Sequence, residues 1–344
     1  MSPKARLHVW LDQAGKFAAR SGGASRLLPA AGFIGGVFLF LVLVVFQERS
    51  GADRRDPGAA GTTVPPPLSA QPSKALRAAV VGEPVDFESA IAAGIRGEGW
   101  VSVSLHVALY EDGRRGRKLG DGASPASNMY WGALFGVDNF LVNEAGWTRI
   151  HSDEGNGRSI VRRSIFRKTV EPTAAWVERG IEEPFDLFVL AQAWPHARIR
   201  EAMTQPIREA MCGDRTLFDV DGRKVSFGAG SAMVGYLGQN QMLTDYWDPF
   251  AMLDDCPPRP TQIGVFYLAP RSGVLMHRPV VDHGLYSVLF AREIITPEAY
   301  IFNGMMNALI SGELGDDFMS EAAAAYTRYQ KSLTLTQAQL VLYR

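Results

Sequence analysis

The residues of this chain best suited to chemistry lie in loops that directly follow predicted strands. After the strand predicted over 233–237 comes Gly238-Gln239-Asn240-Gln241, and after the one over 263–268 comes Ala269-Pro270-Arg271-Ser272-Gly273. Side-chain amides can hydrogen-bond a ligand, and an arginine can hold an anion, although amides in turns more often bond their own backbone. The candidate binding residues here are Gln239, Asn240, Arg271 and Ser272.

Other groups that could carry chemistry have weaker contexts. Asp112 follows the strand predicted over 101–110, and Asp254 stands beside another acid. Adjacent acids in loops are usually solvated, and calcium would need further oxygen ligands. The six histidines match no metal-ligand spacing, and the chain has no nucleophile elbow, P-loop or dinucleotide fingerprint. We therefore expect no cofactor and no metal, and keep Asp112 as a candidate binding residue.

The chain has two cysteines, Cys212 and Cys256, whose spacing matches no zinc motif. Outside the cytoplasm they could form one disulfide, provided that their Cα atoms approach closely enough. Two buried free thiols are the alternative, and the sequence leaves both open.

The hydropathy pattern predicts alternating strands and helices. The predicted helices are a short one over 129–134 capped by Asn128, one opened by Pro195 and kinked at Pro206, one from Pro297 to Gly312, and one over 318–331. The predicted strands span 101–110, 160–170, 185–194, 225–227, 233–237, 263–268 and 285–291. Because most of these strands lack clean period-2 patterning, we expect an α/β fold with a mainly parallel sheet covered by helices on both faces. Ligands of such sheets bind at the carboxyl ends of strands.

Residues 27–46 form an uncharged apolar run of a length that spans a bilayer as a helix. Five basic residues and one acid precede it, which predicts a cytoplasmic N-terminal segment, 1–26, a membrane-spanning signal anchor over 27–47, and the rest of the chain in the periplasm, or outside the cell where there is no outer membrane. A cleaved signal peptide is less consistent with the long leader and the missing Ala-x-Ala site.

The chain beyond the anchor divides into a linker and a globular region. Residues 48–75 are rich in Gly, Ala and Pro and read as a tether, and 76–344 as one periplasmic α/β domain. From residue 76 onward there are 26 basic and 32 acidic residues, a net charge of about −6. This acidic balance argues against a nucleic-acid partner.

Several segments resemble a family of largely uncharacterised exported bacterial proteins. The first segment is Asn128-Met129-Tyr130-Trp131-Gly132-Ala133-Leu134-Phe135-Gly136, which marks Asn128, Tyr130 and Trp131 as candidate binding residues. The similar segments further along are 234–240, 295–300 and 322–331. The resemblance covers roughly 101–332.

The resemblance carries an implication for activity. Members of that family have His at the position of Gln239 and Cys at the position of Pro270, an arrangement similar to the dyad of caspase-like cysteine peptidases. Glutamine is no general base near neutral pH, and proline has no nucleophile. The resemblance therefore implies a degenerate site on a caspase-like scaffold.

From these features we expect a non-catalytic binding or scaffold domain, held to the lipid bilayer through residues 27–46, that engages another envelope or membrane protein. Two alternatives stay open. One is an envelope hydrolase that uses Asp112, Asp254 or Cys212. The other is a small-ligand receptor with Gln239, Asn240 and Arg271 in its pocket.

Overall fold

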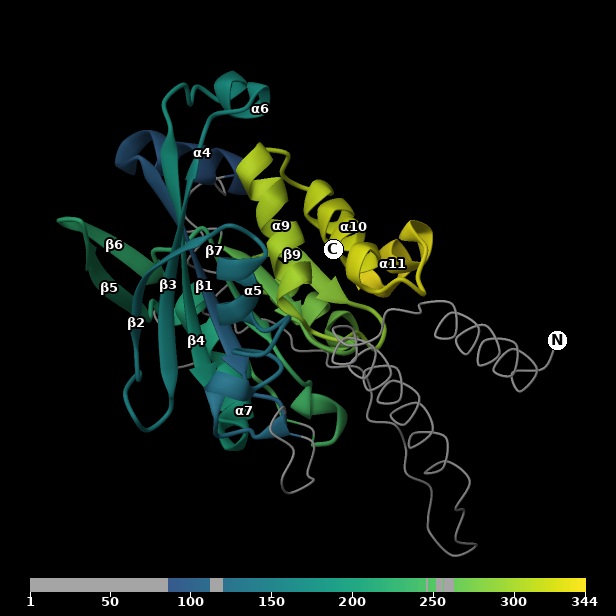
Figure 1. The fold of residues 1–344 in the computed structure, drawn as a ribbon. Coiled ribbons are helices and arrows are strands. Elements are labelled where there is room, and N and C mark those ends of the chain that lie inside the picture. Colours follow the sequence, from purple (N-terminus) through teal and green to yellow (C-terminus); the bar gives the residue numbers. More distant parts are fainter. Residues whose placement is uncertain (1–85, 112–119, 246, 252–255, 257–262) are drawn as a thin grey trace, which may run out of the picture. The chain divides into compact units, whose positions relative to one another are not determined.

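One sheet of eight strands organises the part of the chain that the computed structural model describes, which is residues 86–111, 120–245, 247–251, 256 and 263–344. The strand order across the sheet is β10-β9-β8-β7-β1-β4-β3-β2 (Figure 1). The strands are β1 (Trp100–Ala108), β2 (Thr148–Asp153), β3 (Arg162–Val170), β4 (Phe185–Trp194), β7 (Met233–Leu237), β8 (Gly264–Leu268), β9 (Tyr286–Ala291) and β10 (Leu342–Tyr343).

The five central strands are parallel and the outer ones are not. β4, β1, β7, β8 and β9 run in one direction, whereas β3, β2 and β10 join the sheet antiparallel to their neighbours. Every residue of β7 and β8 is buried. A parallel sheet covered on both faces requires this, because neither face of a central strand meets water. The predicted α/β class with a mainly parallel sheet is thus confirmed, with antiparallel strands at its two edges.

Helices α4 (Phe87–Glu98), α9 (Ala299–Ser311) and α10 (Asp317–Tyr329) cover one face of the sheet. Phe302 of α9 stacks near Phe266 of β8, and α9 and α10 lie side by side (Figure 1). The helices α5 (Val137–Asn143), α6 (Ala174–Glu178) and α11 (Leu335–Val341) are short.

The opposite face is covered by α7 (Ile199–Ile207), α8 (Arg278–Asp282) and the hairpin of β5 (Arg215–Val220) and β6 (Arg223–Gly228). Met203 and Ile207 of α7 share an apolar cluster with residues of β7 and β8, and the hairpin packs on β3 and β4. α7 runs directly into a π-helical turn, Arg208–Cys212. The predicted helix after Pro195 is therefore present, with Pro206 in its last turn.

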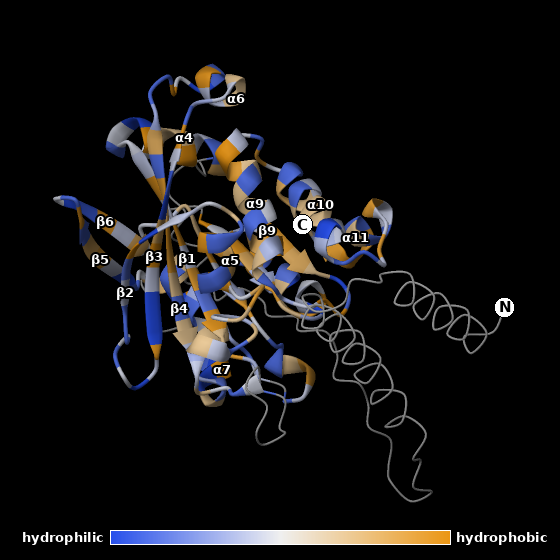
Figure 2. Cartoon of the chain, in the orientation of Figure 1, coloured by the Kyte–Doolittle hydropathy of each residue, from blue (hydrophilic) through white to orange (hydrophobic). Residues whose placement is uncertain are grey.

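Hydropathy follows this layered arrangement. In Figure 2 the central strands are mainly hydrophobic, whereas the edge strand β2 is mostly hydrophilic, with Ile150 as its one aliphatic residue. Its six residues are all exposed or only partly buried. An edge strand with charged side chains resists pairing with another chain, which is the usual protection of an open sheet edge.

One local prediction is wrong. Residues 129–136 form consecutive turns, and α5 begins only at Val137, so Asn128 caps no helix. The helix predicted after Asp316 is present as α10, and the short elements α11 and β10 follow it. The strands β2, β5 and β10 and the helices α4, α5, α6, α8 and α11 were not predicted.

The described residues contain no helix that is long and apolar enough to cross a membrane. The run 27–46, the leader, the linker and the candidates Asp112 and Asp254 lie outside the described residues.

Candidate binding site

The loops singled out by sequence meet at one edge of the sheet. Strand pairing sets Ala108 beside Trp194, and Val107 beside Leu237. The neighbouring strand brings Leu237 beside Leu268. With strands about 4.8 Å apart, the chain segments leaving β4, β1 and β7 start within about 10 Å of one another. The carboxyl edge of the parallel strands is therefore the candidate site.

Asn128 is a structural residue of this edge. Its side chain is fully buried and makes four hydrogen bonds. Oδ1 accepts from the backbone N–H groups of Tyr110 (3.0 Å) and Tyr130 (3.1 Å), while Nδ2 donates to the carbonyls of Tyr110 and Asp121, each at 2.9 Å. An asparagine amide offers two donors and an acceptor oxygen with two lone pairs, so none remains for a ligand.

These bonds explain why 129–136 form turns and not the predicted helix. The Asn128 carbonyl accepts from Gly132 and Ala133, and the chain then folds tightly on itself. A Cβ on Gly132 would lie 2.2 Å from the carbonyl oxygen of Ala126, and one on Gly136 would lie 2.4 Å from the carbonyl carbon of Trp131. Only glycine fits such close backbone approaches. The segment 128–136, the first of those that carry the family resemblance, is thus a tight turn structure at the end of β1.

Tyr130 and Trp131 also belong to the core, with exposed fractions of 3% and 2%. The Tyr130 ring packs edge-on against Tyr110, with ring centroids 5.5 Å apart. Burial raises the pKa of Tyr130 well above its usual value, and the neighbouring Tyr110 and Glu298 raise it further. Because both side chains are covered by protein, they support the edge and do not face a ligand.

Asn240 and Ser272 hold the loops after β7 and β8 in place. Asn240 Nδ2 donates to the Pro270 carbonyl (2.7 Å), and its Oδ1 accepts from the Met242 N–H (3.1 Å). Ser272 Oγ donates to the Tyr267 carbonyl (2.6 Å) and accepts from the Ala291 N–H (2.9 Å). Both side chains therefore bind backbone.

Gln239 is a predicted binding residue whose side-chain oxygen still has no hydrogen bond within the described residues. Its backbone carbonyl accepts from the Tyr236 hydroxyl (2.7 Å), but its side-chain Oε1 is buried and finds no partner among the described residues. A buried polar atom without a partner costs about 1–3 kcal/mol. Because Gln239 is only partly buried as a residue, a rotation of its side chain toward solvent would let Oε1 accept a hydrogen bond from a ligand.

Arg271 follows Pro270 in an uncommon backbone conformation. Its φ of 53° is left-handed, and its N–H donates to the Glu293 carbonyl (3.0 Å). A non-glycine residue adopts this region rarely and at some cost in energy. The half-buried Arg271 is thus held at the end of β8, where its charge can meet an anionic group.

Sequence reasoning missed His196, which follows β4 at the same edge. Its Nδ1 is buried and has no partner among the described residues. A Cβ on Gly122 would lie 2.5 Å from both His196 Cβ and Glu111 Oε2, so the start of the His196 side chain and this exposed carboxylate lie close to Gly122. The rule that ligands bind at the carboxyl ends of parallel strands would have found His196, had it been applied to β4 as well.

A second histidine, His106, is buried in the middle of β1 and pairs with Glu209. His106 Nε2 lies 3.0 Å from Glu209 Oε1, and its Nδ1 accepts from Trp194 Nε1 at 3.2 Å. Because an indole nitrogen only donates, the imidazole proton sits on Nε2 and points at the carboxylate. His106 is inaccessible to solvent. The pair therefore joins β1 to the π-helical turn and has no access to a substrate.

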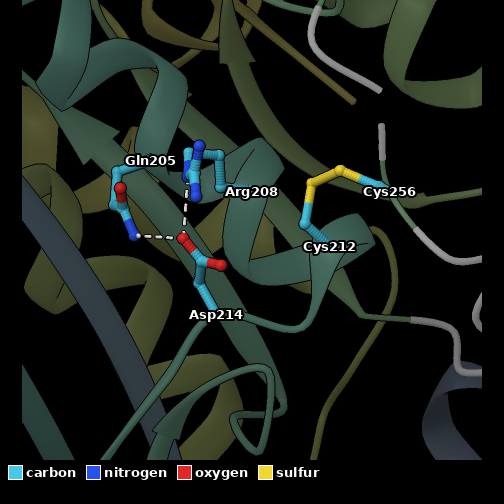
Figure 3. The surroundings of a disulfide bond; sticks show 5 residues. All are labelled: Gln205, Arg208, Cys212, Asp214 and Cys256. Carbon is cyan, nitrogen blue, oxygen red and sulfur yellow. Dashed lines mark hydrogen bonds and ion pairs between the residues drawn. A yellow bond between two sulfur atoms is a disulfide. The ribbon is translucent and has the colours of Figure 1, made fainter. Parts of the chain in front are cut away.

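The two cysteines are bonded to each other. Figure 3 shows Cys212, the last residue of the π-helical turn, joined to Cys256, with their Cα atoms 4.7 Å apart. Beside it, Asp214 accepts from Arg208 Nε (2.7 Å) and Gln205 Nε2 (3.4 Å). A disulfide sulfur is no thiolate, so Cys212 is not a nucleophile in this state.

The fold and its carboxyl edge define an α/β protein with a mainly parallel mixed sheet. Within the described ranges, no group of three or more His, Cys, Asp or Glu side chains could hold a metal ion. At the edge, the described side chains include hydrogen-bonding groups and the cation of Arg271.

No protein-family model, curated protein or solved structure matches this chain.

Proposed function

We propose that this chain is a membrane-tethered, non-catalytic binding protein of the bacterial envelope, and that its α/β domain engages another envelope component at the carboxyl edge of the sheet. The observation that carries the proposal is the pair of buried, unpartnered polar atoms at that edge, Gln239 Oε1 and His196 Nδ1. Near Gln239, the side chains of Asn240 and Ser272 are already bonded to backbone.

The resemblance to caspase-like peptidases supports the non-catalytic part of the proposal. Gln239 and Pro270 occupy the positions that hold His and Cys in the resembled family. An amide neither takes nor gives a proton near neutral pH, so it suits hydrogen bonding and not acid–base catalysis. A caspase-like scaffold that has lost its dyad would keep a preformed groove for a partner segment.

A crosslinking experiment on the full-length chain in bacterial membranes tests the proposal. A photoreactive residue replaces Gln239, and a matched variant carries it at Leu217, an exposed residue of β5 on the hairpin. We expect one crosslinked species of defined mass from position 239 and none from 217. Adding His196→Ala to the variant with the photoreactive residue at position 239 should lower the yield of this crosslinked species. Equal crosslinking at both positions, or none at 239, would contradict the proposal.

A small-ligand receptor is the second candidate, because the same unpartnered atoms could meet a small molecule. It predicts a ligand-dependent rise in melting temperature, since binding to the native state stabilises it. That rise should disappear in Gln239→Ala. An envelope hydrolase, the other alternative, predicts turnover that Asp112→Ala abolishes while the melting temperature stays unchanged.

A further inference from the structure

A pocket of about 280 Å³ opens at the amino edge of the sheet, where β1, β7 and β8 begin. Since β1 has nine residues at about 3.3 Å each, this pocket lies roughly 25 Å from the carboxyl edge. It is therefore separate from the site discussed above, and no step of the proposed function uses it.

Missing side chains create the pocket. One side is α4, which contributes Ala90 and Gly94, and the other is the turn before β7, with Ala229, Gly230 and Ala232. A Cβ on Gly94 would meet nothing within 4 Å. Gly94 and Glu98 are exposed, so the pocket reaches solvent beside α4.

The remaining walls are largely apolar. Phe87 and Ile91 of α4, together with Trp100 and Ile263, line the space. Apolar cavities of about 150 Å³ hold a molecule the size of benzene. A volume of about 280 Å³ therefore holds a single-ring molecule together with a polar head group.

The polar groups in the pocket offer acceptors. Ser102 Oγ donates to the Ser226 carbonyl (2.7 Å), so at its 3.1 Å contact with Ser231 it must accept. The Ser231 proton is thereby used, and its oxygen lone pairs stay available. The exposed carboxylate of Glu98 is a second acceptor in the lining. Ser231 and Glu98 therefore favour a ligand that donates a hydrogen bond.

We propose that this pocket binds a small, mainly apolar molecule whose head group, a hydroxyl or an amine, donates a hydrogen bond to Ser231 or Glu98. Ligand sites of this kind combine apolar walls with a small number of placed polar groups. The ring packs between α4 and the 229–232 turn, and the head group meets the acceptors.

Calorimetric titration of the full-length chain with phenol, and separately with benzylamine, tests the proposal. Gly94→Leu fills the pocket and should weaken both probes roughly tenfold or more. Gly97→Leu is the matched control, because Gly97 lies on the same helix, also faces open space, and does not line the pocket. Both variants gain helix propensity, so loss of folding would not explain a difference between them.

Two further substitutions test which residues bind the head group of the ligand. Ser231→Ala should weaken phenol roughly fivefold, the loss of one hydrogen bond, and leave toluene unchanged. Glu98→Gln should weaken benzylamine more than phenol. The proposal is overturned if neither probe binds the unsubstituted chain, if Gly97→Leu weakens binding as much as Gly94→Leu, or if toluene binds as tightly as phenol. None of these results bears on crosslinking at Gln239, so the two proposals fail separately.

Discussion

The buried carboxyl group of Glu298, just before α9, should make the stability of the fold depend on pH. Its exposed fraction is 1%, and its Oε2 has no hydrogen-bond partner within the described residues. Burial raises the pKa of Glu298 from 4.5 to about 7, although a hydrogen bond with Tyr300 acts in the opposite direction. The folded protein therefore binds this proton more tightly than the unfolded chain does.

The sign and size of the effect follow from proton linkage. Between pH 4.5 and about 7 the folded state holds the proton that the unfolded state has lost, so the free energy of unfolding falls as pH rises through this window. A shift of about 2.5 pKa units corresponds to about 3 kcal/mol, which is fully lost above pH 7.

Glu298→Gln removes this dependence. The amide resembles the protonated acid but has an additional N–H, which costs about 1 kcal/mol if it stays unpaired. We expect the variant to be about 1 kcal/mol less stable than the unsubstituted chain at pH 4 and about 2 kcal/mol more stable at pH 8. Urea unfolding of both chains across this range, with the disulfide intact, measures the difference.

Glu313→Gln is the matched control, because Glu313 is an exposed glutamate just beyond the other end of α9. Its free energy of unfolding should differ from that of the unsubstituted chain by the same small amount at every pH. If Glu298→Gln also shows a constant offset, the buried carboxyl group does not take up a proton on folding, and the reasoning from burial is refuted.

Three further outcomes are expected. Reducing the Cys212–Cys256 disulfide should cost about 4 kcal/mol in urea unfolding, because it closes a loop of 44 residues in the unfolded chain; Cys212→Ser should be insensitive to reductant, and equal sensitivity would contradict the link. Asn128→Ala should cost about 3 kcal/mol or more, since three buried backbone groups and the partly exposed Asp121 carbonyl lose a hydrogen bond; Asn143→Ala, at an exposed position, should cost under about 0.5 kcal/mol. Alkaline phosphatase fused to the C-terminus should be active and a conventional fluorescent protein there dark, whereas the reverse pattern would refute the predicted orientation.

The central strands were predictable because their information is local. β4 spans Phe185–Trp194, as the apolar run predicts, and β1, β7, β8 and β9 lie within a residue or two of the predicted ranges. A strand buried on both faces must be apolar throughout, so its sequence marks it whatever its neighbours are. Helices α9 and α10 were recognisable for a related reason, since Gly312 and Asp316 mark where one ends and the next begins.

The edges of the sheet and the turns were not predictable in this way. β2 is polar except for Ile150, and β10 has two residues, so neither carries a strand pattern of its own. Asn128 is a sound helix cap by its residue type, but its amide instead bonds the end of β1, which tertiary contact alone brings within reach. The hydrogen bonds of Asn128 to Tyr110, 18 residues earlier in the chain, therefore override its preference for capping a helix.

By itself, the sequence determined the α/β class, the central parallel strands and the edge at which to look for a ligand, because burial on both faces leaves a mark in every residue of a strand. Only the tertiary structure decided which polar groups at that edge are used and which are left over. Asn240 and Ser272 are bonded to backbone, Gln239 Oε1 and His196 Nδ1 are not, and the cysteines are paired. A side chain's hydrogen-bond partners come from segments far away in the chain, and no local pattern records them.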